Sequence, residues 1–183
     1  MTSQINRFKG EQRSLTTEPD RFSDDAWDLL LAAQDLARRW RHADLDVEHL
    51  LQVLFSDPAY TNWIDGLKIN NTELLDRVEQ FLSEQPMSRS EQLFVGDVLE
   101  DFLEEAEQSR LRWGSKLIDV SHFLMAFGKD QRIGAELFED FGLSTQRLQI
   151  DLRQLPNRNP EDSQSLRYAQ DDENLLISGE NLT

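Results

Sequence analysis

Residues 45–51 read Leu-Asp-Val-Glu-His-Leu-Leu, and the pattern returns at residues 118–124 as Ile-Asp-Val-Ser-His-Phe-Leu. When the chain is shifted against itself by 73 residues, residues 27–57 align with residues 100–130 and ten positions are identical. An internal duplication is therefore the strongest signal in the sequence. The identical pairs are Asp28/Asp101, Leu30/Leu103, Ala33/Ala106, Arg39/Arg112, Trp40/Trp113, Asp46/Asp119, Val47/Val120, His49/His122, Leu51/Leu124 and Asp57/Asp130.

Charge and composition disfavour several classes of protein. The 183 residues include 35 acidic and 19 basic ones, which gives a net charge of −16, and there is no cysteine. Nucleic acid and anionic membranes are poor partners for such a chain, because binding to phosphate groups needs clustered lysine and arginine. No apolar run approaches the roughly 18 residues of a membrane span, and no secretory signal opens the chain. The lack of cysteine excludes disulfides and is typical of a cytoplasmic protein, which we expect here.

Apolar content divides the chain into one folded region and two tails. Residues 1–20 are polar and are expected to form a flexible leader. Residues 156–183 carry six acidic and two basic residues, which is typical of an acidic flexible linker. Residues 21–155 are expected to fold as one domain. Within it, residues 21–85 form the first repeat and residues 90–155 the second, with turn-forming residues between them.

The first repeat predicts four helices. Ser23 is a suitable N-cap before Asp24 and Asp25, whose charges favour the positive end of a helix. Apolar residues then recur at the three-and-four spacing of one buried stripe as far as about Arg41, and Asp46 supplies a second N-cap. The four helices are expected from 24 to about 41, from 47 to 55, from 58 to 65, and from a cap at Asn71 or Thr72 to 82.

The second repeat predicts four more helices. Its first helix carries an apolar stripe from Val95 to Ala106, and a third helix is expected from about 131 to 141. Eight helices in two equivalent sets predict an all-α domain: a duplicated four-helix unit with pseudo-twofold symmetry and a core shared by the two first helices. Asp119 and Ser144 are expected to cap the second and fourth helices, and the four helices are expected to end at Gly114, Gly128, Gly142 and Leu155.

No motif in the sequence points to catalysis. The fragment Gly114-Ser115-Lys116 lacks the upstream glycine and the GK[ST] ending of a phosphate-binding loop, so we predict no ATPase and no enzyme in these residues. His49 and His122 occupy equivalent places, and neither has a second ligand at metal-binding spacing. We interpret both as core histidines bonded to the backbone or to a helix end. No metal and no cofactor are expected.

Three other features have structural explanations. His42 follows a helix end, where a positive charge is favoured by the helix dipole. The acidic cluster at residues 100–107 falls opposite the apolar stripe, which predicts a solvated face in preference to a metal site. Trp27 and Trp63 have no tryptophan counterpart in the second repeat, so they are candidates for a surface specific to one repeat, although core packing is more typical.

These residues carry a resemblance to a known family. Two four-helix units, each opening its second helix with an Asp-Val-Xaa-His motif, resemble the duplicated amino-terminal domain of the Clp AAA+ unfoldases ClpA, ClpC and ClpB. The resemblance covers residues 20–155. The stretches at residues 21–27, 46–51 and 90–93 are especially similar to the ClpB-type disaggregases, and parts of residues 158–183 resemble the linker that enters the first ATPase module of that family.

The resemblance implies a binding role in place of catalysis. In the family this domain sits on a flexible linker above a hexameric ATPase ring and takes unfolded or aggregated protein segments or adaptor proteins. A groove between two similar helical units can expose apolar side chains to such segments, and weak single contacts gain from several linked copies. A hexamer is expected only if the chain is attached to an AAA+ module.

The contact residues that this resemblance implies are four. Ser23 lies at a hydroxyl-bearing position at the start of the first helix, and Leu99, Leu103 and Leu117 follow the second repeat's side of the groove between the repeats. Each also has a structural explanation, because Ser23 is a helix cap and leucines at this spacing are more often core residues.

A second hypothesis remains open at the level of the sequence. A free-standing accessory protein with the same domain would bind a Clp ATPase ring or peptidase and modulate its assembly without touching client proteins. The reading frame downstream of residue 183 separates the two hypotheses, because the first requires that an ATPase module follow.

Overall fold

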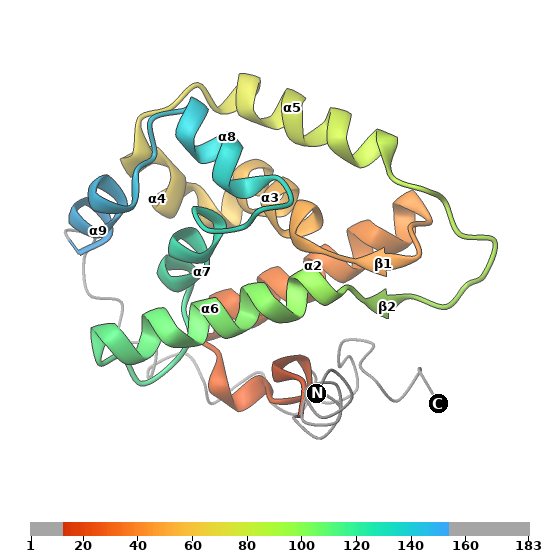
Figure 1. The fold of residues 1–183 in the computed structure, drawn as a ribbon, viewed down its shortest axis with the longest axis horizontal. Coiled ribbons are helices and arrows are strands. Elements are labelled where there is room, and N and C mark those ends of the chain that lie inside the picture. Colours follow the sequence, from red (N-terminus) through yellow and green to blue (C-terminus); the bar gives the residue numbers. More distant parts are fainter. Residues whose placement is uncertain (1–12, 154–183) are drawn as a thin grey trace, which may run out of the picture.

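The computed structural model describes residues 13–153, and helices dominate this range (Figure 1). It contains eight α-helices, α2 to α9, and one sheet of two short strands, which confirms the all-α prediction. In the first repeat these are α2 (Asp24–Trp40), α3 (Val47–Ser56), α4 (Thr61–Ile64) and α5 (Asn71–Glu84); in the second they are α6 (Asp97–Trp113), α7 (Val120–Phe127), α8 (Gly134–Asp140) and α9 (Thr145–Arg153). Short 3-10 turns are η1 (Leu15–Thr17), η2 (Pro19–Arg21), η3 (Pro58–Tyr60) and η4 (Asp65–Leu67).

The two repeats are related by an approximate twofold exchange. Strand β1 (Asp44–Leu45) pairs in parallel with β2 (Phe94–Val95), and Phe22 forms a parallel bridge with Ile118. Adding 73 to Phe22 gives position 95, and adding 73 to Leu45 gives position 118, so the duplication turns one pairing into the other. The backbone bonds follow the same rule, because Ser23 donates to the carbonyl of Ile118 and Gly96 to that of Leu45, both at 2.8 Å. The predicted pseudo-twofold symmetry is confirmed.

The core is shared between the repeats by crossed packing. Helices α3 and α7 lie in the middle of the bundle, with α2 and α6 along one side and α5 and α8 along the other (Figure 1). Helix α2 contacts α3 and also α7, while α6 contacts α7 and also α3. The rings of Phe22 and Phe102 both pack against Phe123, at centroid distances of 6.2 and 5.5 Å. The predicted shared core therefore runs through the second helices of both repeats.

The ends of the helices follow local side-chain chemistry. Asn70, not Asn71 or Thr72, caps α5 by accepting the backbone N–H of Glu73. Helices α2 and α6 end at equivalent residues that both adopt the left-handed conformation, Arg41 at φ 58° and Gly114 at φ 67°. A glycine adopts this conformation without steric cost, so the predicted stop at Gly114 is confirmed, whereas Arg41 ends its helix without that help.

The amino-terminal boundary of the domain lies earlier than the sequence predicts. The Ser14 hydroxyl donates to the Glu100 carboxylate on α6 at 2.6 Å, and Thr16 is fully buried. Residues 13–20 therefore pack on the domain as two 3-10 turns, which corrects the prediction of a flexible leader for that part. The remainder of the predicted leader and the acidic tail at residues 156–183 lie outside the described residues.

Candidate functional site

The two Asp-Val-Xaa-His motifs are helix starts. Asp46 and Asp119 cap α3 and α7, and the third helical residue of each, His49 or His122, accepts the backbone N–H of the capping aspartate at 3.0 and 2.8 Å. This is a capping box in which histidine takes the place of glutamate. Burial lowers the pKa of both histidines to about 4, so both are neutral at pH 7. The prediction that they are core histidines bonded at a helix end is confirmed.

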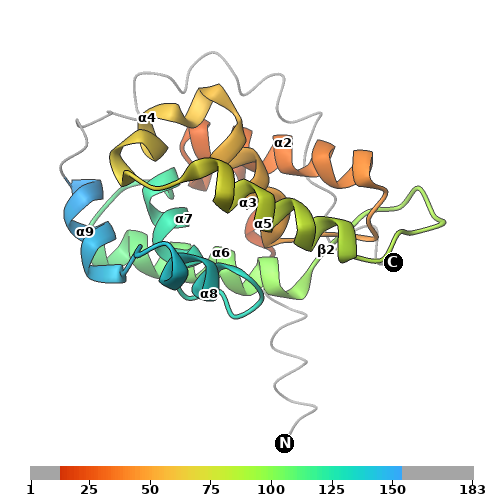
Figure 2. The same ribbon diagram turned by 90° about the horizontal axis from the view of Figure 1, so that it is seen from above.

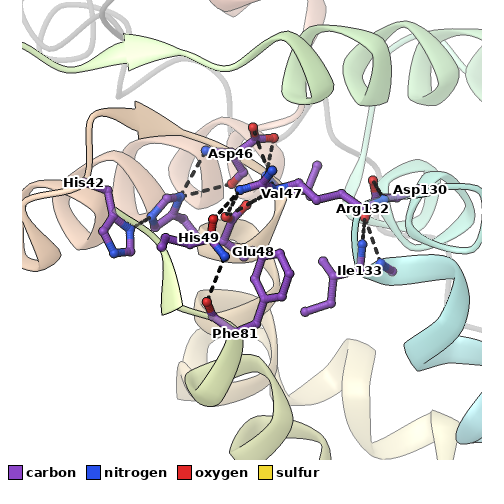
Figure 3. Close-up of polar contacts among 11 residues, drawn as sticks. His42, Asp46, Val47, Glu48, His49, Phe81, Asp130, Arg132 and Ile133 are labelled. Atoms are coloured by element: carbon purple, nitrogen blue, oxygen red, sulfur yellow. Dashed lines mark hydrogen bonds and ion pairs between the residues drawn. The ribbon is translucent and has the colours of Figure 1, made fainter. Parts of the chain in front are cut away.

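A second histidine belongs to the first motif alone. His42 lies 5% exposed, and its Nδ1 shares a hydrogen bond of 2.8 Å with Nε2 of His49 (Figure 3). Burial, which outweighs the attraction of Glu48, lowers the pKa of His42. The expectation that His42 acts as a cation at the helix end is therefore wrong, because the cost of burying a charge exceeds the gain from the helix dipole.

A buried ion pair joins the repeats beside this motif. Glu48 of α3 is 1% exposed and accepts two hydrogen bonds from Arg132, Nε to Oε1 at 3.0 Å and Nη2 to Oε2 at 2.8 Å (Figure 3). The guanidinium of Arg132 also donates to Gln85 and lies 5.3 Å from the ring centre of Phe81. A fork-shaped guanidinium matches a carboxylate in this way better than an ammonium does.

The turn that carries Arg132 is fixed by one aspartate. The carboxylate of Asp130 accepts the backbone N–H groups of Arg132, Ile133 and Gly134 at 2.8–3.1 Å. These bonds delay the start of α8 to Gly134, three residues after the predicted start at Gln131. The turn between α7 and α8 is thereby held against the side of α6.

A surface pocket of about 580 Å³ lies between α6 and this turn. Its apolar part comes from Val98, Phe102 and Ala126. Around these lie charged side chains, and Lys129 donates to Glu105 across the pocket edge at 2.7 Å. Although burial opposes the shift, the bonds from Lys129 and Arg112 lower the pKa of Glu105. The full lining is Val98, Asp101, Phe102, Glu105, Ala126, Lys129, Asp130, Gln131 and Arg132.

The first repeat has a side chain in the equivalent place. The phenol of Tyr60, 3% exposed, reaches across to α2 and donates to the backbone carbonyl of Asp25 at 3.3 Å. A shift of 73 residues places Asp25 on Val98 of the pocket and Tyr60 on Ile133. The branched side chain of Ile133 is shorter than tyrosine, so the pocket stays open in the second repeat only.

The structure does not assemble the four residues that the resemblance implies. Leu99 and Leu103 are fully buried and face the core, so as folded they present no surface to a partner. Ser23, 4% exposed, accepts the backbone N–H of Ala26 and donates its hydroxyl to Asp119 at 2.7 Å. Leu117 is partly exposed in the loop before α7. The placement of Leu99 and Leu103 in a groove is corrected, because helical spacing identifies the inward face of α6 and not its depth.

The acidic cluster on α6 is tied down to neighbouring segments. Glu107 pairs with Arg21 at 2.6 Å and with Arg110 at 2.7 Å, and its side chain is 13% exposed. Those two arginines lower the pKa of Glu107. The predicted solvated face is thus partly a set of ion pairs that hold η2 and the end of α6. In residues 13–153 no group of three or more acidic or histidine side chains is arranged to hold a metal ion.

Two further expectations can be compared with the structure. Trp27 and Trp63 are 3% and 7% exposed, so both pack in the core and neither forms a repeat-specific surface. No helix in the described part of the chain is long and apolar enough to cross a membrane. The pocket residues Val98, Glu105 and Lys129 were not predicted. The signal that could have found them is the exchange of tyrosine for isoleucine between the aligned repeats.

Comparisons with known proteins agree with this fold. The family model described as the Clp repeat (R) N-terminal domain matches residues 21–141. The chain is 56% identical over 147 residues to the chaperone protein ClpB 2 of Parasynechococcus marenigrum, and 31% identical over 140 residues to ClpB 1 of Synechocystis sp.. These matches cover 80% and 75% of this chain, but only 16% of each relative.

Solved structures share the same architecture. The Hsp104 N-terminal domain of Candida albicans aligns with a TM-score of 0.63 at 17% identity, covering 74% of this chain and 95% of that one. The N-terminal domain of the ClpV1 ATPase from E. coli aligns with a TM-score of 0.62 at 20% identity, covering 80% and 90%. Another structure, described as a peptide from the SciI protein of EAEC, aligns with a TM-score of 0.62 at 21% identity, covering 81% and 100%. The chain belongs to the Clp repeat N-terminal domain family and is of the ClpB type.

Proposed function

We propose that this chain is the polypeptide-binding N-terminal domain of a ClpB-type ATP-dependent chaperone. Its partners are unfolded or aggregated protein segments or adaptor proteins, and its role is binding in place of catalysis. Its place is the cytoplasm, as expected from a chain without cysteine. The observation that carries the proposal is the open pocket between α6 and the α7–α8 turn, on a domain of the ClpB type.

The chemistry of the pocket suits a polypeptide. Val98, Phe102 and Ala126 supply apolar surface, while Asp101 and Glu105 stand on the same side of α6. Ligand sites combine apolar lining with a few polar groups in this way. Burying a single apolar side chain there yields only a few kcal/mol before ordering costs, so the contact is expected to be weak and reversible.

The binding of peptides is named for one structural relative. The printed description of one aligned structure refers to a peptide from the SciI protein. That partner belongs to the other protein. For this chain the description supports only the general proposal that the fold presents a surface to a segment of another polypeptide.

A titration of the 183-residue chain into a fluorescently labelled, permanently unfolded protein tests the proposal. Saturable binding measured by anisotropy is expected. Val98→Asp should raise Kd about tenfold, the equivalent of about 1.4 kcal/mol, because it places a charge in the apolar part of the pocket. The fold should tolerate this change, since Asp25 stands at the equivalent position of α2 and acidic residues suit the first turn of a helix.

Glu104→Ala is the matched control, because Glu104 is exposed on the same helix and does not line the pocket. Its Kd should stay within about twofold of the native value, as expected for a surface change away from the site. Absence of saturable binding by the native chain would contradict the proposed function. Equal Kd values for Val98→Asp and Glu104→Ala would move the binding site away from the pocket.

The accessory hypothesis is separated by a second binding partner. Binding to an isolated Clp peptidase or ATPase ring, with no binding to unfolded protein, would favour a protein that modulates assembly. No feature of the described residues favours that function over client binding, so the accessory role stays the alternative.

A further inference from the structure

We propose that the pocket of the second repeat takes an aromatic side chain of the bound polypeptide, tyrosine above all, in the position that Tyr60 occupies in the first repeat. The inference deepens the proposed function, since it names the side chain that the site recognises. It rests on a comparison inside the molecule, in which one repeat shows the site filled and the other shows it open.

The positions that surround Tyr60 correspond to the pocket lining. The Tyr60 hydroxyl donates to the carbonyl of Asp25, and burial together with the nearby carboxylates of Asp25 and Asp57 raises the pKa of the phenol. Adding 73 converts Asp25 and Asp57 to Val98 and Asp130, both of which line the pocket. A backbone carbonyl has two lone pairs, so the carbonyl of Val98 can accept a hydroxyl as well as its helical N–H.

The lining of the second repeat favours an aromatic ring more than that of the first. Phe102 stands where the first repeat has Leu29. Its ring already packs against Phe127 at 4.7 Å and Phe123 at 5.5 Å. A further ring in the pocket can extend this group, because aromatic pairs gain from tilted or edge-to-face contact beyond the area that they bury.

The charges around the pocket select the neighbours of that ring. Three carboxylates, those of Asp101, Glu105 and Asp130, line the pocket together with the cations Lys129 and Arg132. Each cation is already paired, Lys129 with Glu105 and Arg132 with the buried Glu48. The whole chain carries a net charge of −16. The occupant is therefore a tyrosine flanked by lysine or arginine in an extended segment.

A peptide series provides the first test. The probe is a labelled nine-residue peptide of glycine and serine with a central tyrosine flanked by two lysines, titrated with the 183-residue chain. Replacing the tyrosine by phenylalanine should weaken binding about twofold, because only the hydroxyl is lost. Replacement by alanine should weaken binding at least tenfold. Equal binding of the tyrosine and alanine peptides would overturn the inference.

Exchanging the two repeat-specific residues provides the second test. Ile133→Tyr should fill the pocket from within and reduce binding of the tyrosine peptide at least tenfold, because the first repeat already accommodates tyrosine at the equivalent place. Tyr60→Ile should open a second hollow, and the stoichiometry measured by calorimetry should rise from one peptide per chain to two. Glu104→Ala should leave Kd and stoichiometry unchanged.

The outcomes separate this inference from the proposed function. If Ile133→Tyr keeps native binding of the tyrosine peptide with an intact circular dichroism spectrum, the pocket does not hold the aromatic ring and the inference is overturned. The native chain can still bind unfolded protein in that case, and the proposed function stands. If the native chain binds neither unfolded protein nor peptide, the proposed function fails. Should Ile133→Tyr not fold, the peptide series on the native chain decides alone.

Discussion

The start of α3 and the start of α7 are built alike, whereas the spaces beside them are filled differently. Both helices begin with an aspartate cap and a histidine that returns a bond to the cap's backbone N–H. Beside α3 stand Tyr60 and the buried Glu48; the equivalent positions beside α7 hold Ile133 and Ser121. The duplicated features therefore set the fold, and the features that differ create a pocket in one repeat only.

The largest expected effect tests whether the two repeats contribute equally to one core. Leu30 and Leu103 are equivalent and fully buried. Leu30→Ala and Leu103→Ala should each lower the free energy of unfolding by about 3 kcal/mol, from lost burial and the cavity left behind. Urea unfolding followed by tryptophan fluorescence should show one transition for both variants. Two separate transitions, or a loss confined to one variant, would show that the repeats fold as independent units.

The next effect tests the ion pair that exists on one side of the twofold only. Arg132→Ala should cost about 3 kcal/mol, because it leaves the Glu48 carboxylate buried and unpaired. The double variant Glu48→Ser/Arg132→Ala copies the other repeat, where Ser121 and Ala59 stand at these positions. It should recover most of the lost stability in a double-mutant cycle.

Arg77→Ala is the control for this cycle. The pair of Arg77 with Asp140 is exposed, with side chains 39% and 50% accessible, so its loss should cost less than about 1 kcal/mol. If the double variant is no more stable than Arg132→Ala, the buried charge is not the cause of the loss.

A smaller effect concerns the residues that precede α2 and α6. A β-carbon on Gly96 would meet the Asp46 carboxylate oxygen at 2.3 Å. Gly96→Ser should therefore cost about 1–3 kcal/mol, because the buried cap of α3 must move. Ser23→Gly at the equivalent position should cost less than about 1 kcal/mol, since glycine is a tolerated cap. Thermal unfolding of the two variants measures both, and the reverse order would show that the two helix starts are not packed as described.

The smallest effect is the dependence of stability on pH. The lowered pKa values of His49 and His122, about 4 each, mean that the unfolded chain binds more protons as pH falls below 6.5. Burial and the nearby Glu48 raise the pKa of Asp46 to about 7, so the folded chain binds one more proton between pH 4 and 7. The effects nearly cancel between pH 6 and 8, and stability should fall by about 1 kcal/mol from pH 7 to pH 5.

Asp46→Asn should make that fall steeper, because asparagine keeps the cap but removes the opposing proton uptake. Urea unfolding at a series of pH values measures both curves. An equal slope for the native chain and Asp46→Asn between pH 5 and 7 would show that Asp46 does not titrate as described.

Local patterns in the sequence predicted the helix starts, and long-range packing limited the rest. Asp46 and Asp119 could be identified as caps because their chemistry acts within one helical turn. The pair Glu48–Arg132 joins residues 84 positions apart, and no periodicity reports such a contact. The depth of Leu99 was likewise hidden, since spacing tells which face of a helix is apolar but not what covers that face. Alignment of the repeats is the one sequence signal that could have indicated the pocket.

Backbone amide NMR during titration with the tyrosine peptide tests the central claim most directly, because it compares the two repeats in one experiment. We predict that chemical shifts change at residues 98–105 of α6 and 126–133 around the α7–α8 turn, while residues 25–32 and 53–60 of the first repeat stay unchanged. Shifts of equal size in both repeats, or shifts that avoid both sets, would contradict the account.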